Sequence, residues 1–349
     1  MKISTPGRIC LFGEHQDYLG LPIIAMAISL RVKINGNKRS DNQIIIHKKD
    51  LNETEKFSLS NLNYTKSRDY FKSSIKVCKE AGLNFSNGLE CEITSDIPIG
   101  AGTSSSSAVI VSWIHFLSKM ADQHPNWDQK IVGKLAYLSE AKEFNEPCGM
   151  MDQYTTALGN LIYLESEPQL KIKTLNPRLG TFVLGDSCEP KDTIEILKRC
   201  RDSRVSIFEK LKSKNQNSTI FSINENANLS NLDNEEIELF QATLKNRNIL
   251  KKGLEELNKE NPDHSLIGRL LYKHHRTLRD ILKVSTSKID SMLDASLDAG
   301  ALGGKINGSG GGGCMFAYAP ENPEKVADAI KSVGGKSFVV NMDSGTKEE

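Results

Sequence analysis

The sequence predicts an α+β protein with two domains. Its 349 residues suit two domains of about 150 residues each. Strand-like runs and amphipathic helical segments are mixed along the whole chain, and two glycine-rich clusters interrupt them. We expect the boundary near Asn176-Pro177, which gives domains 1–176 and 177–349.

In the first domain, short apolar runs predict strands and longer amphipathic runs predict helices. The dipeptide Pro6-Gly7 is expected to separate the first two strands. The expected strands are 2–4, 8–12, 42–47, 89–93 and 161–165, with a further apolar run at 22–30, and the expected helices are 70–81, a helix from the serine cluster to 120, and 131–144.

The second domain is expected to be richer in helices. A polar, asparagine-rich segment at 215–234 is interpreted as a surface insertion. The expected helices are 191–211, 235–257, 266–282 and 287–299, and the expected strands are 181–186 and 315–319.

The stretch PIGAGTSSSSA at 98–108 is the first candidate site. Gly100 and Gly102 allow a tight turn close to a ligand, and the serines precede an apolar run that is long enough for a helix. The free N–H groups and the dipole of a helix N-terminus favour a phosphate. A flexible Gly/Ser linker is the alternative.

Two polar segments flank this stretch in the sequence. GEHQDYLG at 13–20 brings Glu14, His15 and Asp17 into one loop, where they could bind a polyol or form an ordinary solvated turn. NEPCGMMDQY at 145–154 contains Asp152, which is either a poised acid or base or the N-cap of a helix.

A second glycine cluster, GALGGKINGSGGGGC, occupies 300–314. It lies between an expected helix and an expected strand and has no Ser/Pro tract around it. We therefore expect a tightly packed loop rather than a tether.

The composition is that of a globular protein, with 38% hydrophobic and 26% charged residues. A net charge of +1 without a basic block gives no electrostatic case for nucleic acid or an acidic membrane surface. No run is apolar and long enough for a membrane span or a signal peptide, so we expect a cytoplasmic protein. The seven cysteines include no CxxC pair, which disfavours a zinc site or a disulfide framework and favours buried thiols.

The combination of motifs resembles the GHMP kinases. PGRICLFGEHQDYLG, PIGAGTSSSSA and NGSGGGGC match their three motifs in order, and the first is similar to that of galactokinases. SEAKEFNEPCGMMDQ and HHRTLRDILKVSTSKID also resemble galactokinase segments. The resemblance implies an N-terminal domain like domain 2 of ribosomal protein S5 and a ferredoxin-like C-terminal domain. It also implies transfer of the ATP γ-phosphoryl group to a sugar hydroxyl with Mg²⁺, in a monomer or weak dimer.

The resemblance also implies a role for each site residue. Asp152 would accept or position the hydroxyl proton, with Arg8 beside it. Ser106 and Glu140 would bind magnesium. The remaining positions would hold the ATP phosphates (Gly100, Gly102, Ser104, Ser105, Ser106) or the sugar (Glu14, His15, Asp17, Gly149).

Several departures from galactokinases bear on the substrate. The chain has no tyrosine between Asp186 and Tyr272, where galactokinases carry one that touches the sugar. Leu19, Leu21 and Ser67 replace the usual Asn, Gly and Trp, and the second glycine cluster resembles that of heptose and fucose kinases. The resemblance favours phosphorylation of galactose at C1. The alternatives are a 1-kinase for another hexose, a uronic acid or an amino sugar, and a non-catalytic sugar and ATP sensor. A mevalonate-pathway kinase is disfavoured because GEHQDY is of the sugar type.

Overall fold

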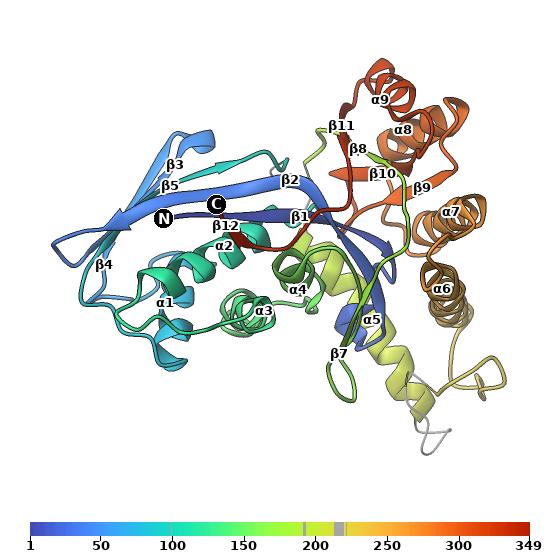
Figure 1. The fold of residues 1–349 in the computed structure, drawn as a ribbon. Helices are drawn as coiled ribbons and strands as arrows, with labels where there is room; N and C mark the ends of the chain where they lie inside the picture. Colours follow the sequence, from blue (N-terminus) through green and yellow to red (C-terminus); the bar gives the residue numbers. More distant parts are fainter. Residues whose placement is uncertain (99, 191–192, 213–219, 221) are drawn as a thin grey trace.

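The chain forms two β-sheets with helices packed against each of them (Figure 1). This arrangement comes from a computed structural model that describes residues 1–349 except 99, 191–192, 213–219 and 221. It confirms the expected α+β architecture. Within the described residues, no helix is both long and apolar enough to cross a membrane.

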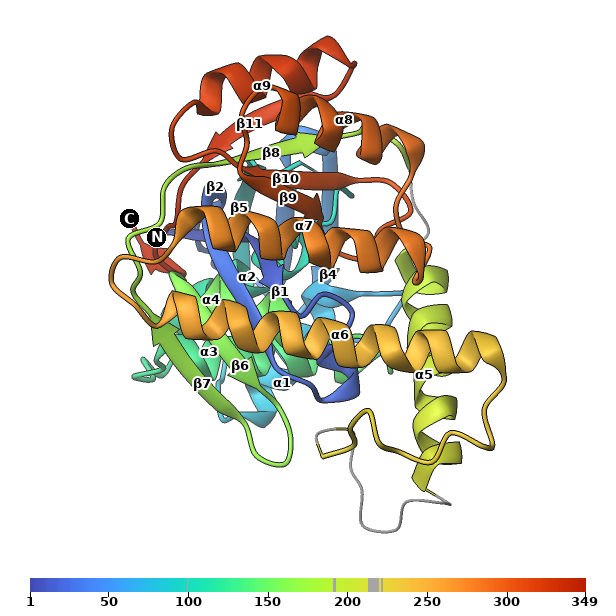
Figure 2. The same ribbon diagram turned by 90° about the vertical axis from the view of Figure 1, so that its right-hand side faces the viewer.

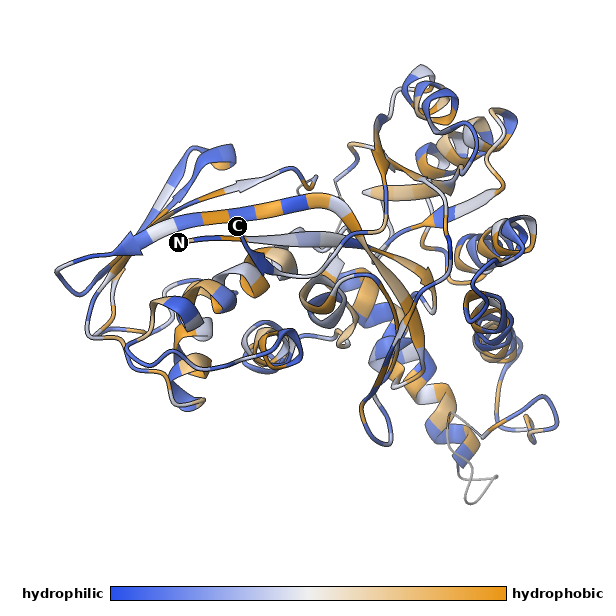
Figure 3. Cartoon of the chain, in the orientation of Figure 1, coloured by the Kyte–Doolittle hydropathy of each residue, from blue (hydrophilic) through white to orange (hydrophobic). Residues whose placement is uncertain are grey.

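The first sheet has the strand order β12-β1-β2-β5-β3-β4, with β6 beside β2 and β7 beside β6. All pairs are antiparallel except β3 with β5. The first six residues of β2 are all apolar and buried, whereas hydrophobic and polar residues alternate along its later part, where the sheet buries one face beneath the helices (Figure 3). Its strands are β1 (Lys2–Phe12), β2 (Ile23–Lys38), β3 (Gln43–Lys48), β4 (Glu53–Ser58), β5 (Leu89–Ser95), β6 (Leu161–Glu165), β7 (Lys171–Leu175) and β12 (Lys347–Glu348).

Four helices lie along one face of this sheet: α1 (Tyr70–Glu80), α2 (Ser105–Met120), α3 (Gln129–Tyr137) and α4 (Met151–Leu158). The apolar run of α2 forms the centre of the core, where Trp113 stacks on Phe116 and meets Phe71 edge to face. The expected helix at 131–144 is shorter. It ends at Tyr137 and continues as a π-helical turn, Leu138–Lys142, which carries Glu140.

The strand expected to stop at Pro6-Gly7 continues through it, so that expectation was wrong. The register of β1 on β2 shifts between Pro6 and Gly7, which is a β-bulge. A bulge tolerates proline because the missing N–H interrupts a ladder that is already irregular. Directly after the bulge, the N–H of Arg8 donates to the carbonyl of Thr103 at 3.2 Å. The bulge therefore joins β1 to the loop before α2.

The second sheet has the order β11-β8-β10-β9, and all pairs are antiparallel. Helices α8 and α9 cover one face, and α7 lies against β9 and beside α6 (Figure 2). A Cβ on Gly268 or Gly303 would meet the other segment's backbone, so the two glycines allow this close approach. The elements are β8 (Phe182–Asp186), α5 (Thr193–Lys212), α6 (Asn234–Leu257), α7 (His264–Asp280), α8 (Ser287–Asp298), β9 (Gly303–Ile306), β10 (Cys314–Tyr318), α9 (Pro323–Ser332) and β11 (Lys336–Val340).

Helices α6, α7 and α8 begin close to their expected starts, because capping side chains mark these starts in the sequence. Asp233 forms a capping box with Glu236, and Asp263 and Thr286 accept from N–H groups in the first turns of α7 and α8. Strands β4, β7, β9, β11 and β12 and helix α9 were not predicted. The start of the expected helix at 191 and residues 215–219 and 221 of the expected insertion lie outside the described residues. Five cysteines are buried, as expected for thiols, whereas Cys148 is half-buried and Cys188 is exposed.

The C-terminal segment returns to the first sheet. Strand β12 pairs with β1, and the guanidinium of Arg31 donates to Asp343 (2.7 Å) and to the carbonyls of Ser344 (3.0 Å) and Gly345 (2.8 Å). The chain passes between the sheets from β7 to β8, in the region of the expected 176/177 boundary. Because the last strand lies in the first sheet, that boundary stays a prediction.

Candidate active site

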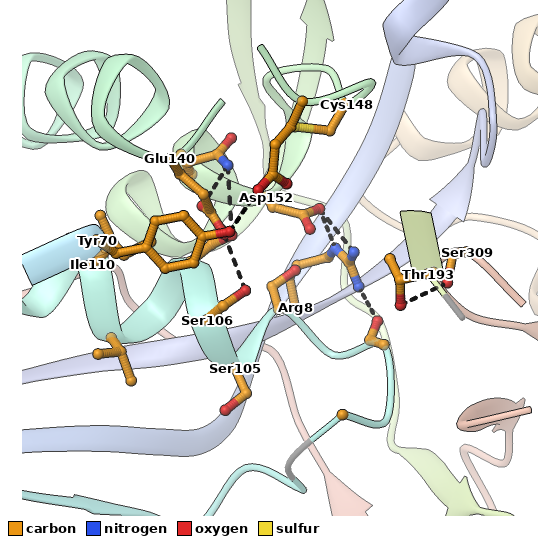
Figure 4. Close-up of a pocket in the computed structure, with 18 of the residues that line it drawn as sticks. Arg8, Tyr70, Ser105, Ser106, Ile110, Glu140, Cys148, Asp152, Thr193 and Ser309 are labelled. Carbon is orange, nitrogen blue, oxygen red and sulfur yellow. Dashed lines mark hydrogen bonds and ion pairs between the residues drawn. The ribbon is translucent and has the colours of Figure 1, made fainter. Parts of the chain in front are cut away.

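One cavity of about 560 Å³ gathers all the residues that the sequence predicted for the site. Its walls come from β1, from the loops that precede α2 and α4, and from the second glycine cluster (Figure 4). The predicted residues in its lining are Arg8, Glu14, His15, Asp17, Gly100, Gly102, Ser104, Ser105, Ser106, Glu140, Gly149 and Asp152. The structure therefore brings together groups that lie up to 144 residues apart in the sequence.

The two glycine clusters pack against each other at the base of this cavity. A Cβ on Gly308 would lie 2.7 Å from the carbonyl oxygen of Gly102, and one on Gly313 would lie 2.7 Å from that of Ala101. The N–H of Cys314 donates to the Ala101 carbonyl at 2.7 Å. The expected packed loop is confirmed, and the linker interpretation of the first cluster is excluded.

The serine cluster starts α2 without using a side-chain cap. Ser104 is the N-cap in a left-handed conformation, with φ of 59°, and its buried hydroxyl has no hydrogen-bond partner within the described part of the chain. Ser104 and the first residues of α2 line the cavity, and the N–H groups of a helix's first turn have no partner within the helix. Such a donor set suits phosphate oxygens.

Arg8 and Asp152 form an ion pair inside the cavity. Arg8 Nε donates to Asp152 Oδ1 at 2.8 Å, and Nη2 lies 2.7 Å from the same oxygen. Arg8 is buried, whereas 31% of the Asp152 side chain is exposed toward the cavity. The N-cap of α4 is Met150, so Asp152 does not have the capping role that the sequence left open.

Glu140 faces Ser106 and is held from behind. Its Oε2 accepts from Ser107 (2.7 Å) and Gln153 (2.6 Å), which leaves Oε1 in contact with Ser106 Oγ at 3.0 Å. Burial raises the pKa of Glu140 to about 7. A hydroxyl and a carboxylate oxygen side by side are hard donors that fit Mg²⁺, which keeps most of its ligands from water and phosphates. The described residues contain no group of three or more His, Cys, Asp or Glu side chains that could hold a metal alone.

Glu14 is neutralised by a lysine that the sequence analysis did not consider. Lys305 Nζ donates to Glu14 Oε2 at 2.7 Å and to the Cys10 carbonyl at 2.9 Å. Both charged side chains are buried, 2% exposed for Glu14 and 0% for Lys305. This pairing fixes the carboxylate orientation, since a buried unpaired charge is strongly unfavourable.

Asp17 and Gly149 are in close contact. A Cβ on Gly149 would lie 2.3 Å from Asp17 Oδ2, so only glycine leaves room for the carboxylate. Burial, and secondarily the negative charge of Asp152, raise the pKa of Asp17 to about 7. Asp17 can therefore donate or accept a hydrogen bond near neutral pH.

Both ring nitrogens of His15 contact protein groups. Nδ1 lies 2.9 Å from the hydroxyl of Tyr18, and Nε2 lies 3.0 Å from the carbonyl oxygen of Ser309. A hydrogen bond from His15 to a bound sugar would require one of these contacts to open. The roles implied for His15 and for the other site residues stay predictions.

At its other end the cavity lies beside α1, β5 and α2. Apolar and aromatic side chains line it there (Leu51, Tyr70, Phe71, Ile93 and Ile110), and the charged Lys48, Asp50, Arg68 and Glu146 also line the cavity. Figure 4 shows Tyr70 and Ile110 on the side of Ser105 and Ser106. The sequence analysis identified no residues for a nucleotide base. A purine ring suits such a surface because its faces are apolar.

Sequence reasoning missed several groups that hold the site residues in place. Lys305 and Gln153 were missed although each had a signal: Lys305 is a charged residue within a glycine and apolar run, and Gln153 directly follows Asp152. Ser107 belongs to the serine cluster but was not assigned a role. Ser309 lies in the third motif, NGSGGGGC, but nothing in the sequence indicates its contact with His15. Arg204 has no signal in a single sequence, because its contact with Tyr18 depends on long-range packing.

Family models match three parts of the chain. They are the GHMP kinases N terminal domain at residues 69–160, the GHMP kinases C terminal at residues 250–336, and the galactokinase galactose-binding signature at residues 2–37. Together they include β1, β5 and most of β2 from the first sheet, β9 and β10 from the second, and the loop that carries Glu14, His15 and Asp17.

Curated relatives of two activities align along nearly the whole chain. A mevalonate kinase of Thermococcus onnurineus is 30% identical over 99% of this chain and 97% of its own length. A galactokinase of Haemophilus influenzae is 26% identical over 100% of this chain and 91% of its own length.

The fold is also that of a solved galactokinase. The Lactococcus lactis galactokinase complexed with galactose has a TM-score of 0.89 at 21% identity, and the match covers 100% of this chain and 95% of that one. At this identity the likeness concerns the fold alone.

Proposed function

This chain belongs to the GHMP kinases, and we propose that it transfers the γ-phosphoryl group of ATP to the anomeric hydroxyl of a monosaccharide, with galactose as the first candidate. The observation that carries the proposal is the Arg8–Asp152 pair, which faces the cavity beside the serine loop. Phosphoryl transfer depends mainly on positioning and charge neutralisation.

Asp152 would orient the acceptor hydroxyl and take its proton. It suits this role because 31% of its side chain is exposed, whereas Glu14 is 2% exposed and Glu140 accepts hydrogen bonds from Ser107 and Gln153. Arg8 would keep Asp152 ionised and offset negative charge as the bond to phosphorus forms.

ATP would lie with its phosphates over Gly100–Ser106 and its base at the apolar end of the cavity. The orphaned hydroxyl of Ser104 and the N–H groups at the start of α2 support this orientation. Ser106 and Glu140 would hold Mg²⁺, which would neutralise negative charge on the ATP phosphates.

The sugar subsite would lie on the side of the cavity opposite the ATP base. It would be formed by Glu14, His15, Asp17 and Gly149. The galactose-binding signature at residues 2–37 supports a sugar at this position. The lack of the C-terminal tyrosine leaves another hexose, a uronic acid or an amino sugar as alternatives, and a non-catalytic sensor is the alternative outside the enzymes.

Mevalonate is the second candidate acceptor. The sequence motifs disfavoured it, yet mevalonate kinases of Thermococcus and Pyrococcus species align at 28–30% identity. The raised pKa of Asp17 is compatible with an acidic acceptor, because a protonated Asp17 adds no negative charge.

The test is ADP release from ATP and Mg²⁺ across a panel of galactose, other hexoses, galacturonate, galactosamine and mevalonate. We expect turnover with galactose, and ³¹P NMR should place the phosphate on C1. If mevalonate is the one compound of the panel that is phosphorylated, mevalonate and not a sugar is the acceptor. Binding of sugar and ATP without turnover would support the sensor, and neither binding nor turnover would overturn the proposal.

A further inference from the structure

A buried arginine lies behind the proposed acceptor loop without a carboxylate partner. Arg204 on α5 is 1% exposed and forms no ion pair within the described residues. Its Nε donates to the Cys200 carbonyl at 2.8 Å, and its Nη2 donates to the hydroxyl of Tyr18, over whose ring the guanidinium lies. An isolated buried charge is costly, so its position calls for a physical explanation.

The hydrogen bonds continue from Arg204 to the second glycine cluster. The Ser309 carbonyl can only accept, so His15 Nε2 carries the proton at this 3.0 Å contact. Nδ1 then accepts from the Tyr18 hydroxyl at 2.9 Å, whose oxygen in turn accepts from Arg204. The four groups form one directed chain in which His15 is neutral and has a single tautomer.

This chain connects the acceptor loop with the phosphate loop. Ser309 follows Gly308, which packs on the carbonyl of Gly102 so closely that a Cβ would lie 2.7 Å away. The hydroxyl of Ser309 also contacts that of Thr193 at 3.4 Å (Figure 4). Movement of His15 would therefore be transmitted to the loop that lies against Gly102.

We propose that Arg204 is a positioning residue that, through Tyr18, holds His15 in one neutral tautomer and thereby couples the acceptor loop to the phosphate loop. The expected effect of Arg204 on the KM values rests on the proposed function, whereas its expected effect on the protonation and tautomer of the His15 ring does not. Arg204 lines neither subsite.

The charges around His15 support this assignment. The positive charges of Arg204 and Arg199 on α5 and of Lys305 on β9 act on the ring, and His274 on α7 interacts with it electrostatically. Burial first, and the charge of Arg204 second, lower the pKa of His15 to about 3. The ring thus stays neutral throughout the physiological range and can keep Nδ1 as an acceptor.

The test compares three variants with the native protein by ¹⁵N NMR of the His15 ring. Arg204→Met removes the charge and the donor, Arg204→Lys keeps the charge, and Tyr18→Phe removes the bond to Nδ1. We expect the pKa of His15 to rise by about one unit in Arg204→Met, to change little in Arg204→Lys, and the tautomers to mix in Tyr18→Phe. The matched control is Arg201→Met. Arg201 lies on the same helix, and its hydrogen-bond partner is the exposed Asp202.

The kinetic arm uses the acceptor identified by the panel. Arg204→Met should raise the KM values for both acceptor and ATP about tenfold and weaken their mutual dependence, with a smaller change in Arg204→Lys. An unchanged ring pKa and tautomer in folded Arg204→Met and Tyr18→Phe would overturn the proposal. If Arg204→Met does not fold, the ring signals of Arg204→Lys and Tyr18→Phe decide. The NMR measurement does not depend on turnover. An inactive protein with the expected ring shifts would therefore contradict the proposed sugar kinase activity and still support the positioning role of Arg204.

Discussion

The two ends of the cavity are built differently. At the phosphate end, Ser106, Ser107, Glu140 and Gln153 all come from the first half of the chain and are joined by neutral hydroxyl and amide donors. At the acceptor end, Glu14 needs Lys305 from the second half, and Tyr18 and His15 likewise need Arg204 and Ser309. The group of serines around Glu140 is therefore held by the first half of the chain alone, although the glycine turn before it packs on Gly308 and Gly313. The charged groups of the acceptor end, by contrast, find their partners only when both halves of the chain have folded together.

The largest effect should follow from replacing the group that lies between the two ends. Asp152→Asn keeps the shape of the side chain and loses the base, so we expect turnover to fall about 10²- to 10⁴-fold while ATP and acceptor still bind. Steady-state kinetics and titration calorimetry check this, with the exposed Asp202→Asn as control. Turnover close to the native rate would reject the assignment of Asp152.

The phosphate end can be tested through its metal site alone. Glu140→Gln should raise the Mg²⁺ concentration for half-maximal activity about 10- to 100-fold and leave the KM for the acceptor unchanged. Because the pKa of Glu140 is about 7 and a cation favours the ionised form, native Mg²⁺ affinity should rise with pH through 7. The exposed Glu143→Gln serves as control, and an equal shift in both variants would contradict the assignment.

The acceptor end should respond to a single added methyl group. Gly149→Ala places a Cβ against Asp17 and should raise the KM for the acceptor about tenfold, with little change for ATP. Gly133→Ala within α3, where the nearest atom would lie at 3.2 Å, is the matched control. Equal increases in the KM for the acceptor and the KM for ATP would contradict the assignment of Gly149 to the acceptor end of the cavity.

The smallest expected effect concerns stability. The pKa of Asp17 is raised from 3.8 to about 7, so the folded protein binds more protons than the unfolded chain between these values, and stability falls as pH rises through this range. Asp17→Asn should remove that slope and add about 1 to 2 kcal/mol to the free energy of unfolding at pH 8. Urea unfolding at pH 5 and pH 8 measures this free energy, and the same dependence on pH in the variant and the native protein would contradict the expectation.

The burial of neutral His15, with a pKa of about 3, has the opposite effect: it makes stability rise with pH between about pH 3 and 6.5.

Sequence reasoning located the lining of the cavity because each part is a short motif with its own backbone requirement. Gly100, Gly102 and the serines that follow them are close together in the chain, and Gly149, which leaves room for the carboxylate of Asp17, lies three residues before Asp152. The sequence marks Lys305 only as a charged residue in a glycine and apolar run, and its contact with Glu14 spans 291 residues. Arg204 has no such mark, and its contact with Tyr18 spans 186 residues.

The errors in the fold have similar causes. Pro6-Gly7 predicts a break when it is considered alone, and only pairing with β2 converts it into a bulge. The short strands β9 and β12 contain glycine, lysine and glutamate, which have low strand propensity, so only their neighbours in the sheet determine them.

The return of the chain's last residues to the first sheet affects how the molecule could be divided. Strand β12 covers the outer edge of β1, and Arg31 holds the segment before it in place. A fragment that stops at residue 176 would leave that edge without its strand and the guanidinium of Arg31 without these acceptors. Exposed edges pair with one another, so we expect such a fragment to self-associate, and co-expression with residues 177–349 to restore a soluble pair.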